Sequence, residues 1–283
     1  MKNIMVENWK RFLKEGFEQG EEQVKHKYYA FDWDDNLLFM PTKIIVKDIN
    51  DEEVGMSTED FAKYRSLIGK EHFDLEENGK TYIIVGFADN PFRNFREEGD
   101  EQFLTDCMSA KTAPAWPDFV ECINSGSIFA IITARGHKPD TLREAVKRLV
   151  LSEKNGLSLS ALIQSLNKYN RLVGLSGADS TSSENVEEEL TMYLERCRMY
   201  PVSYWSASAA SPEKAKVYFM KKFIKEIHKM NDTQKVDIGF SDDDPKNINL
   251  MKKELGKIFK NDIGNNEPKL TIKYTGHLPL EEK

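Results

Sequence analysis

Cysteine is scarce in this chain of 283 residues, which contains three, namely Cys107, Cys122 and Cys197. Their number is odd and no two of them form a CxxC pair, so we expect neither a disulfide framework nor a zinc site. Reduced thiols are typical of proteins in a reducing compartment. The cysteine content therefore predicts a cytoplasmic location.

Long apolar runs and an excess of positive charge are missing as well. No stretch reaches the ~18 consecutive apolar residues of a membrane-spanning helix, and charges interrupt the apolar residues of the N-terminus too often for a signal peptide. The net charge is −7, whereas a broad nucleic-acid surface usually has a basic face. We expect no membrane partner; nucleic acid stays open through a lysine-rich helix over 214–229 but is not favoured. The sequence does not indicate an oligomeric state.

Three familiar signatures are also absent. The sequence contains no GxxxxGK[ST] loop, no GxGxxG fingerprint and no GxSxG elbow. Neither a nucleotide cradle of the first two kinds nor a serine hydrolase is therefore expected.

What is present is an alternation of short apolar runs with helical patterns. Five runs predict strands, over 27–31, 127–133, 201–205, 236–240 and 270–274. Four helical patterns lie between them, over 118–125, 140–151, 213–230 and 245–259. The second and fourth runs are almost continuously apolar, as in strands buried on both faces of a parallel sheet. The pattern predicts an α/β fold with a doubly wound parallel sheet.

Two intervals between these strands are too long for ordinary connections. Residues 42–112 are predicted to form a first insertion, an α+β cap with strand patterns over 42–49 and 80–88 and a helix opened by a capping residue at Ser57 or Thr58. Residues 154–198 are predicted to form a second, mainly helical insertion. We expect both to cover the ligand-binding edge of the sheet.

The remaining residues are assigned to two units. The core is predicted to comprise residues 25–41, 113–153 and 199–283. Residues 1–24 are predicted to form a helical extension, because Trp9, Phe12 and Phe17 can share one helix face.

Polar clusters follow the predicted strands. Asp32, Asp34, Asp35 and Asn36 follow the first strand, Thr133 ends the second and is followed by Ala134 and Arg135, Lys214 opens the helix after the third, and residues 241–247 (SDDDPKN) follow the fourth. Ligands of open parallel sheets bind beyond the carboxyl ends of the strands. These clusters are therefore expected to meet at one edge.

Their chemistry follows from charge. Two acidic clusters brought together cannot all stay ionised without a cation, and carboxylate oxygens are ligands that Mg2+ prefers. A lysine and a threonine nearby provide donors for a phosphate. An aspartate in such a site can attack phosphorus, and a second carboxyl group can transfer the protons.

With these motifs the chain resembles the haloacid dehalogenase-like (HAD) superfamily. The four motifs of that superfamily occur in order as YYAFDWD, FAIIT, SPEKAK and IGFSDDDPKN. The resemblance covers the core and neither insertion. It implies a HAD-like Rossmannoid core with cap-type insertions, and a magnesium-dependent phosphatase that forms an aspartyl-phosphate.

The resemblance also implies roles for individual residues. Asp32 would be the nucleophile and a magnesium ligand. Asp34 would be the acid and base, with its backbone carbonyl as a second ligand. Lys214 would pair with the phosphate and with Asp32, and Lys216 is the alternative for this role.

The remaining roles concern the phosphate and the metal. Thr133 would hydrogen-bond the phosphate, with Ala134 and Arg135 also binding the substrate. Asp242 and Asp243 would hold the metal directly or through water, although three consecutive aspartates leave open which pair faces it. Asn247 takes a later polar position of the superfamily.

The chain departs from the superfamily at two residues and leaves the substrate open. Asp35 and Asn36 stand where a Gly-Thr pair or similar is common. The expected function is hydrolysis of a phosphomonoester, either a phosphorylated small molecule or a nucleotide. The alternatives are a polynucleotide or nucleotide end phosphatase, phosphotransfer to an acceptor other than water, and a non-catalytic metal-binding interaction module.

Three further residues lie in segments expected near the substrate. Arg93 and Arg96, in the first insertion, are candidates for reaching a substrate phosphate or base. His137, four residues after Thr133, is expected to be an exposed loop histidine.

Overall fold

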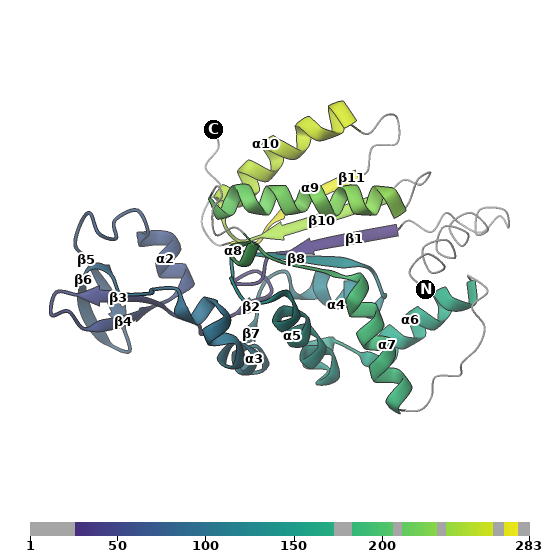
Figure 1. Cartoon of the computed structure of the whole chain (residues 1–283), viewed down its shortest axis with the longest axis horizontal. Helices are drawn as coiled ribbons and strands as arrows, with labels where there is room; N and C mark the ends of the chain where they lie inside the picture. Colours follow the sequence, from purple (N-terminus) through teal and green to yellow (C-terminus); the bar gives the residue numbers. More distant parts are fainter. Residues whose placement is uncertain (1–25, 173–182, 206–210, 231–235, 263–268, 277–283) are drawn as a thin grey trace.

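A computed structural model of the chain describes residues 26–172, 183–205, 211–230, 236–262 and 269–276 (Figure 1). Its centre is a sheet of five parallel strands in the order β11-β10-β1-β8-β9. The strands are β1 (His26–Phe31), β8 (Phe129–Thr133), β9 (Arg198–Pro201), β10 (Val236–Asp242) and β11 (Lys269–Tyr274). The prediction of an α/β fold with a parallel sheet is therefore confirmed.

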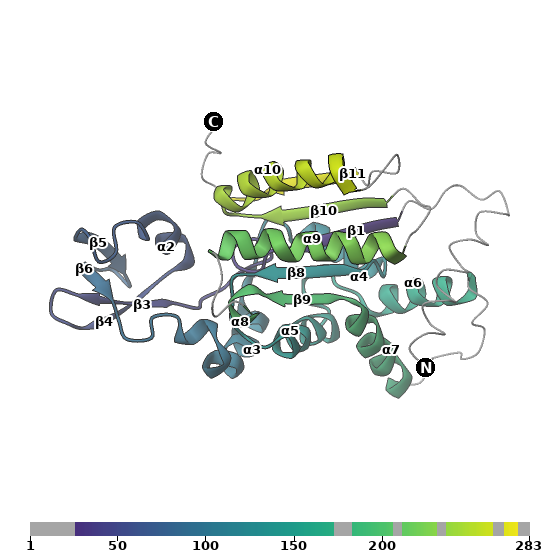
Figure 2. The same cartoon turned by 45° about the horizontal axis from the view of Figure 1, so that its top comes forward.

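Helices cover both faces of this sheet (Figures 1 and 2). Successive residues of β1 and β8 contribute to two separate apolar clusters, because neighbouring side chains of a strand point to opposite faces. One cluster includes Phe31 and Ile131 with residues of α4 (Trp116–Asn124) and α5 (Pro139–Leu151). The other includes Ala30 and Ile132 with residues of α9 (Pro212–Met230) and α10 (Pro245–Asp262).

One predicted strand is displaced. The run over 201–205 is not a strand: β9 ends at Pro201, and residues Val202–Trp205 form the short helix α8. The buried residues Met199 and Tyr200 fill the strand instead. Proline has no backbone N–H to donate and occurs mainly at the edges of sheets, which fits its place at the end of this edge strand.

The first insertion forms a second sheet that projects from the core (Figure 1). Four antiparallel strands pair in the order β4-β3-β6-β5, namely β4 (Glu53–Met56), β3 (Ile44–Asp48), β6 (Lys80–Phe87) and β5 (Phe73–Glu77). Helix α2 (Thr58–Tyr64) has Ser57 as its N-cap residue, whose Oγ accepts from the amide of Asp60. This sheet has its own apolar cluster, which includes Val46, Met56 and Ile84. We call residues 44–96 the cap.

The rest of the first insertion belongs to the core. The 3-10 helix η1 (Arg93–Phe95) ends the cap, and a second one, η2 (Glu97–Gly99), leads into α3 (Asp100–Ser109), which buries Phe103 and Leu104 in the cluster shared with α4 and α5. A two-residue pair, β2 (Leu38–Phe39) with β7 (Lys111–Thr112), closes the insertion.

The second insertion also packs on the core. It contains the 3-10 helix η3 (Lys154–Gly156) and the helices α6 (Leu159–Leu172) and α7 (Ser183–Arg196). Leu162 and Leu190 join the apolar cluster around α4 and α5.

Two further expectations bear on the chain outside the site. The predicted extension over 1–24 lies outside the described residues. None of the helices that the structure describes is both long and apolar enough to cross a membrane.

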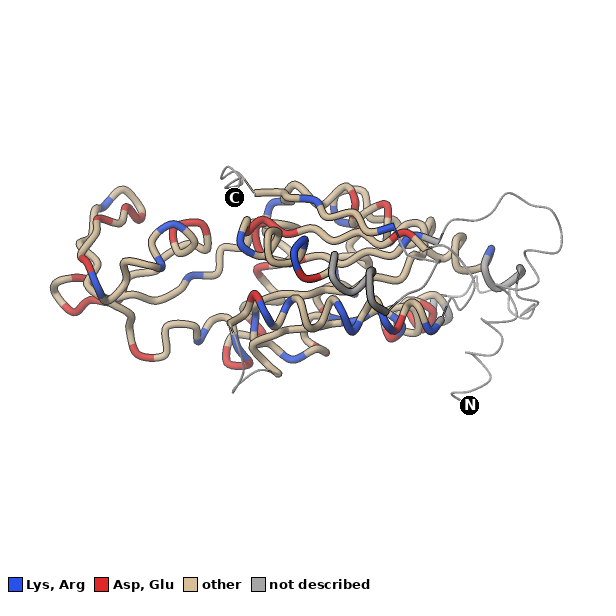
Figure 3. The backbone as a smooth tube through the Cα atoms, turned by 90° about the horizontal axis from the view of Figure 1, so that it is seen from above, with Lys and Arg blue, Asp and Glu red and all other residues tan. Residues whose placement is uncertain are grey.

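Basic and acidic segments alternate along the helices around the central sheet (Figure 3).

Candidate active site

The site lies where β1 and β10 end side by side. Asp32 directly follows β1 and Asp242 ends β10, and the amide of Asp32 donates to the carbonyl of Ser241 at 3.0 Å. The segment after β1 contributes Trp33 and Leu37 to the apolar cluster on one face of the sheet, whereas α10, which follows β10, belongs to the cluster on the other face. The two connections diverge at this point, which opens a crevice at the carboxyl ends of the strands.

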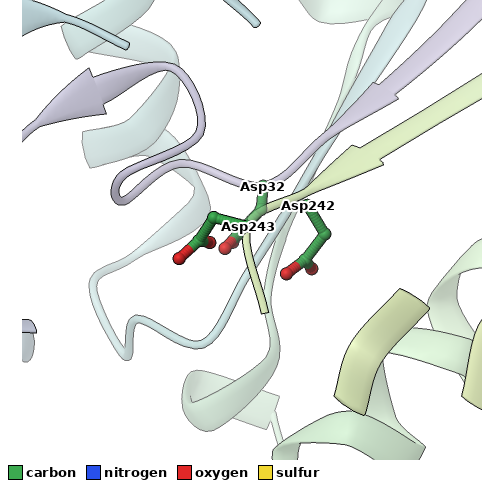
Figure 4. Close-up of side chains that lie close together, drawn as sticks. All are labelled: Asp32, Asp242 and Asp243. Carbon is green, nitrogen blue, oxygen red and sulfur yellow. The ribbon is translucent and has the colours of Figure 1, made fainter. Parts of the chain in front are cut away.

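Three carboxylates and one lysine converge there. Oxygen atoms of Asp32, Asp242 and Asp243 lie within 4.8 Å of one another (Figure 4). The Nζ of Lys216 lies 3.0 Å from Oδ2 of Asp32 and 2.8 Å from Oδ2 of Asp242. The structure thus brings together the two acidic clusters that the sequence places 210 residues apart, at 32 and 242.

The three carboxylates differ in their hydrogen bonds. Both oxygens of Asp242 accept from Nδ2 of Asn247, while Oδ2 also accepts from Lys216 and Oδ1 from the amide of Asp244. These contacts use all the lone pairs that a carboxylate offers. In contrast, Oδ1 of Asp32 is buried and has no hydrogen-bond partner among the described residues. Asp32 therefore has an oxygen left to bind a cation, and Asp243 lines the cavity beside it.

The electrostatics indicate an excess of negative charge. The pKa of Asp32 is raised to about 7, mainly because the carboxyl group is buried; the Lys216 ammonium lowers this pKa and the Asp242 carboxylate raises it. Burial also raises the pKa of Asp243, and the carboxylates of Asp242 and Asp32 add to the effect. A divalent cation bound between these groups would relieve their repulsion.

The lysine that lies beside Asp32 is Lys216. The sequence favours Lys214 for this place, with Lys216 as the alternative. Burial by itself lowers the pKa of Lys216, but the carboxylates of Asp242 and Asp32 outweigh it and raise this pKa above its ordinary value. Lys214 is exposed. Residues two apart on an α-helix point to nearly opposite sides, since each residue turns the helix by about 100°. Only one of the two lysines of α9 can face the carboxylates.

Asp34 lies at the site, where Arg135 forms an ion pair with it. The guanidinium contacts both oxygens of the Asp34 carboxylate, with Nη2 at 2.6 Å from Oδ1 and Nε at 2.9 Å from Oδ2. Arg135 is 1% exposed, and its guanidinium lies between the rings of Phe95 and Phe103, 4.7 and 4.6 Å from their centroids. Asp34 therefore has a fixed orientation beside Asp32.

This geometry changes the expected role of Arg135. Besides Asp34, its guanidinium donates to Oγ1 of Thr42 and to Nε2 of His137. Most of its donors are thus used within the protein, so Arg135 positions Asp34 rather than offering a free fork to a phosphate. Thr133 is fully buried and its Oγ1 accepts from the amide of Arg135 at 3.3 Å. Of the three predicted substrate contacts after β8, Ala134 and Arg135 line the cavity described below and Thr133 does not.

His137 is buried, contrary to the expectation of an exposed loop residue. A guanidinium has only donors, so Nε2 of His137 accepts from Arg135 and Nδ1 donates to Oδ1 of Asp100 at 2.7 Å. Burial lowers the pKa of His137 to about 4, and the charge of Arg135 contributes. The contact with Asp100, on α3, joins two segments 37 residues apart. A local sequence pattern therefore could not predict that His137 is buried.

Asn36 links the two loops of the site. It is buried, and its Nδ2 donates to the carbonyl of Asp32 and to Oγ of Ser241, while its Oδ1 accepts from Oγ1 of Thr275. The Asn36 side chain thus holds the ends of β1 and β10 together.

A cavity of about 520 Å3 opens above the carboxylates, between the core and the cap. Its lining includes Asp32, Asp243 and Lys216 from the core, and Phe61 and Arg65 from the cap. Contacts between the cap and the site include a hydrogen bond from Oγ1 of Thr58 to Asp35 at 2.6 Å and an ion pair of Arg65 with Asp244 at 3.2 Å. Burial raises the pKa of Asp35 to about 6.

The two insertions differ at this cavity. The first insertion contributes part of the lining, as expected. Among the described residues, none of those that line the cavity comes from 154–198. The described helices of the second insertion therefore do not cover the site as expected, because they bury their apolar faces against α4 and α5 instead.

Comparisons with protein-family models, with curated proteins and with solved structures found no significant match to this chain.

Proposed function

We propose that this chain is a magnesium-dependent phosphomonoester hydrolase of the HAD-like kind, with Asp32 as its nucleophile. The observation that carries this proposal is the convergence of Asp32, Asp243 and Lys216 at the carboxyl ends of two neighbouring parallel strands. Phosphoryl transfer through an aspartate requires a nucleophile, a cation and a positive group near the phosphoryl oxygens. Asp32 is the nucleophile, the carboxylates offer oxygens to the cation, and the Lys216 ammonium lies 3.0 Å from Asp32.

The residues present fit a magnesium ion. The unpartnered Oδ1 of Asp32 and the carboxylate of Asp243 supply hard oxygen ligands. Asp242, which accepts from Lys216 and Asn247, would orient these two side chains next to the metal ligands. Bound Mg2+ would offset the charge of the carboxylates and of the transferring phosphoryl group.

In the first half of the reaction, an oxygen of Asp32 attacks phosphorus. The new bond to Asp32 forms as the ester bond breaks, and the leaving oxygen takes a proton from Asp34. Lys216 stays beside Asp32 and offsets the negative charge of the phosphoryl group. The product of this half is an aspartyl-phosphate on Asp32.

In the second half, Asp34 accepts a proton from a water molecule. The oxygen of that water attacks phosphorus, the bond to Asp32 breaks, and inorganic phosphate leaves. Arg135 contacts both oxygens of the Asp34 carboxyl group in the structure and so holds this group beside Asp32.

The proposal is tested by phosphate release from an aryl phosphate with and without Mg2+. We expect activity in Mg2+, loss of this activity on chelation, and loss in Asp32→Asn, which keeps the size of the side chain but is a far weaker nucleophile. Trapping of the wild type with beryllofluoride should add a phosphoryl mimic to Asp32. Full activity of Asp32→Asn would overturn the proposal.

A further inference from the structure

The cavity that contains Asp32 and Asp243 is also lined by aromatic side chains. They are Phe61 of α2, Phe92, which directly precedes η1, and Phe95 of η1, and none of the three is fully buried. The rings of Phe61 and Phe92 lie 5.6 Å apart at 80°, and those of Phe92 and Phe95 lie 6.4 Å apart at 73°. A group bound at the carboxylates would therefore extend toward ring faces and edges.

One cation of this cavity has no acidic partner. Four basic residues line it, namely Arg65, Arg96, Arg135 and Lys216. Arg65, Arg135 and Lys216 each pair with a carboxylate of the core. In the part of the chain that the structure describes, the exposed Arg96 forms no such pair. Its backbone is held beside Gly136, because the neighbouring Phe95 carbonyl accepts from the amide of Gly136 at 2.7 Å.

We propose that Phe61, Phe92 and Arg96 form a subsite for the leaving group, and that this leaving group is a nucleoside. The inference rests on the proposed hydrolysis of phosphomonoesters. A nucleobase has flat faces that stack on aromatic rings, and its carbonyl and ring-nitrogen acceptors match the fork of a guanidinium. A volume of about 520 Å3 is in the range of pockets that bury a ligand of this size. A sugar phosphate has no flat π face to stack on the rings and no ring-nitrogen acceptor for Arg96.

The test measures binding, so that it does not depend on turnover. Asp32→Asn protein in Mg2+ is titrated calorimetrically with nucleoside monophosphates, phenyl phosphate and ribose 5-phosphate. Since stacking on one aromatic side chain is typically worth about tenfold in affinity, we expect nucleotides to bind at least about tenfold more tightly than ribose 5-phosphate. Phenyl phosphate, which has a ring without acceptors, should lie between them.

Matched variants separate the two parts of the subsite. In the same background, Phe92→Leu should weaken nucleotides and phenyl phosphate severalfold and leave ribose 5-phosphate unchanged. Arg96→Met should weaken nucleotides only. The controls are Phe87→Leu and Arg93→Met: Phe87 lies 5.9 Å from Phe92 by ring centroids and Arg93 pairs with Glu53, but neither lines the cavity. Both controls should bind every ligand as the parent does.

Binding and hydrolysis are measured separately, so the subsite and the proposed hydrolysis can be contradicted independently. Equal affinity for nucleotides and ribose 5-phosphate, or an equal loss for both in Phe92→Leu, would overturn the subsite even if the wild type hydrolyses aryl phosphates. A wild type that hydrolyses none of the esters but shows the expected order of affinities would overturn the proposed hydrolysis and leave the subsite in place.

Discussion

At the scale of single residues, the ammonium group of Lys216 is the charge on which the arrangement of the carboxylates depends. It lies within 3.0 Å of both Asp32 and Asp242 and is 2% exposed. Removing one partner of a buried ion pair typically costs about 3–5 kcal/mol because the other charge is left unpaired. A variant here should therefore affect both the fold and the activity.

We expect Lys216→Met to lower kcat/KM for an aryl phosphate by at least about a hundredfold, as loss of a donor to the transferring group typically does. Lys214→Met is the matched control and should keep nearly the full rate, because Lys214 is exposed. Steady-state kinetics of the two variants, with circular dichroism to check the fold, decides the matter. The reverse order of effects would contradict the assignment of Lys216.

His137 should make stability depend on pH. Its pKa is lowered to about 4 in the folded protein, against about 6.5 in an unfolded chain. Between pH 6.5 and 4 the unfolded chain binds a proton that the folded protein does not, so the free energy of unfolding falls as the pH falls through this window. The contribution is complete above pH 6.5, and its loss is on the order of 3 kcal/mol by pH 4.

Urea unfolding at pH 7 and pH 4.5 measures this effect. Glutamine can also accept from Arg135 and donate to Asp100, but it does not titrate, so His137→Gln should lose less stability than the wild type between the two pH values. An identical loss in both proteins would show that other groups cause the pH dependence.

The sequence predicted the residues of the site that depend on strand ends, and not those that depend on helix phase or distant packing. Asp32 and Asp242 follow apolar runs, so the direction of parallel strands is enough to bring them together. Lys214 and Lys216 both flank apolar positions of one helix, and only its rotation on the sheet distinguishes them. The pairing of Arg135 with Asp34 spans 101 residues, which no local pattern encodes.

At the scale of elements, the segment after β11 closes over the loop after β10. The amide of Thr275 donates to the carbonyl of Asp242 at 3.1 Å. A Cβ atom on Gly276 would lie 2.2 Å from the carbonyl oxygen of Asp243. Only glycine permits this approach, so the place of a predicted metal ligand depends on a residue 33 positions away in the sequence.

We expect Gly276→Ala to push the Asp243 backbone aside and to weaken Mg2+ binding about tenfold, with a loss of stability of about 1–3 kcal/mol from overpacking. Gly86→Ala in the cap is the control, because its Cβ would meet no atom within 4 Å. Calorimetric titration with Mg2+ measures the affinities. Unchanged affinity in Gly276→Ala would mean that Asp243 does not hold the metal.

The elements themselves were largely predictable. Runs such as FAIIT are apolar at every position but the last and are buried throughout as β8. The run over 201–205 misled because its apolar letters lie after a proline, whereas the buried pair Met199 and Tyr200 lies before it. The boundary of the first insertion could not be predicted, because α3 packs on the core through Phe103 and Leu104 rather than in the cap.

At the scale of the whole molecule, the metal should control stability. Without a cation, the carboxylates of Asp32, Asp242 and Asp243 repel one another in a buried site. Mg2+ at about a hundred times its Kd should stabilise the fold by about 2.7 kcal/mol, which corresponds to a rise in Tm of roughly 5–10 °C for a domain of this size.

Thermal unfolding of Asp243→Asn supplies the contrast. Removing one charge should leave the metal-free variant at least as stable as the metal-free wild type, and the rise in Tm with Mg2+ should largely disappear. A variant whose Tm rises with Mg2+ as much as that of the wild type would contradict the proposed role of Asp243.

The way in which the chain enters and leaves the cap has a consequence for how such proteins diversify. The two connecting segments run side by side: the amide of Ile45 donates to the carbonyl of Pro91 at 2.9 Å, and that of Ala88 donates to the carbonyl of Ile45 at 3.2 Å. The cap also has an apolar cluster of its own. It is therefore a unit whose two ends lie next to each other, so that a different insertion can replace it without moving the strand ends that carry Asp32 and Asp242.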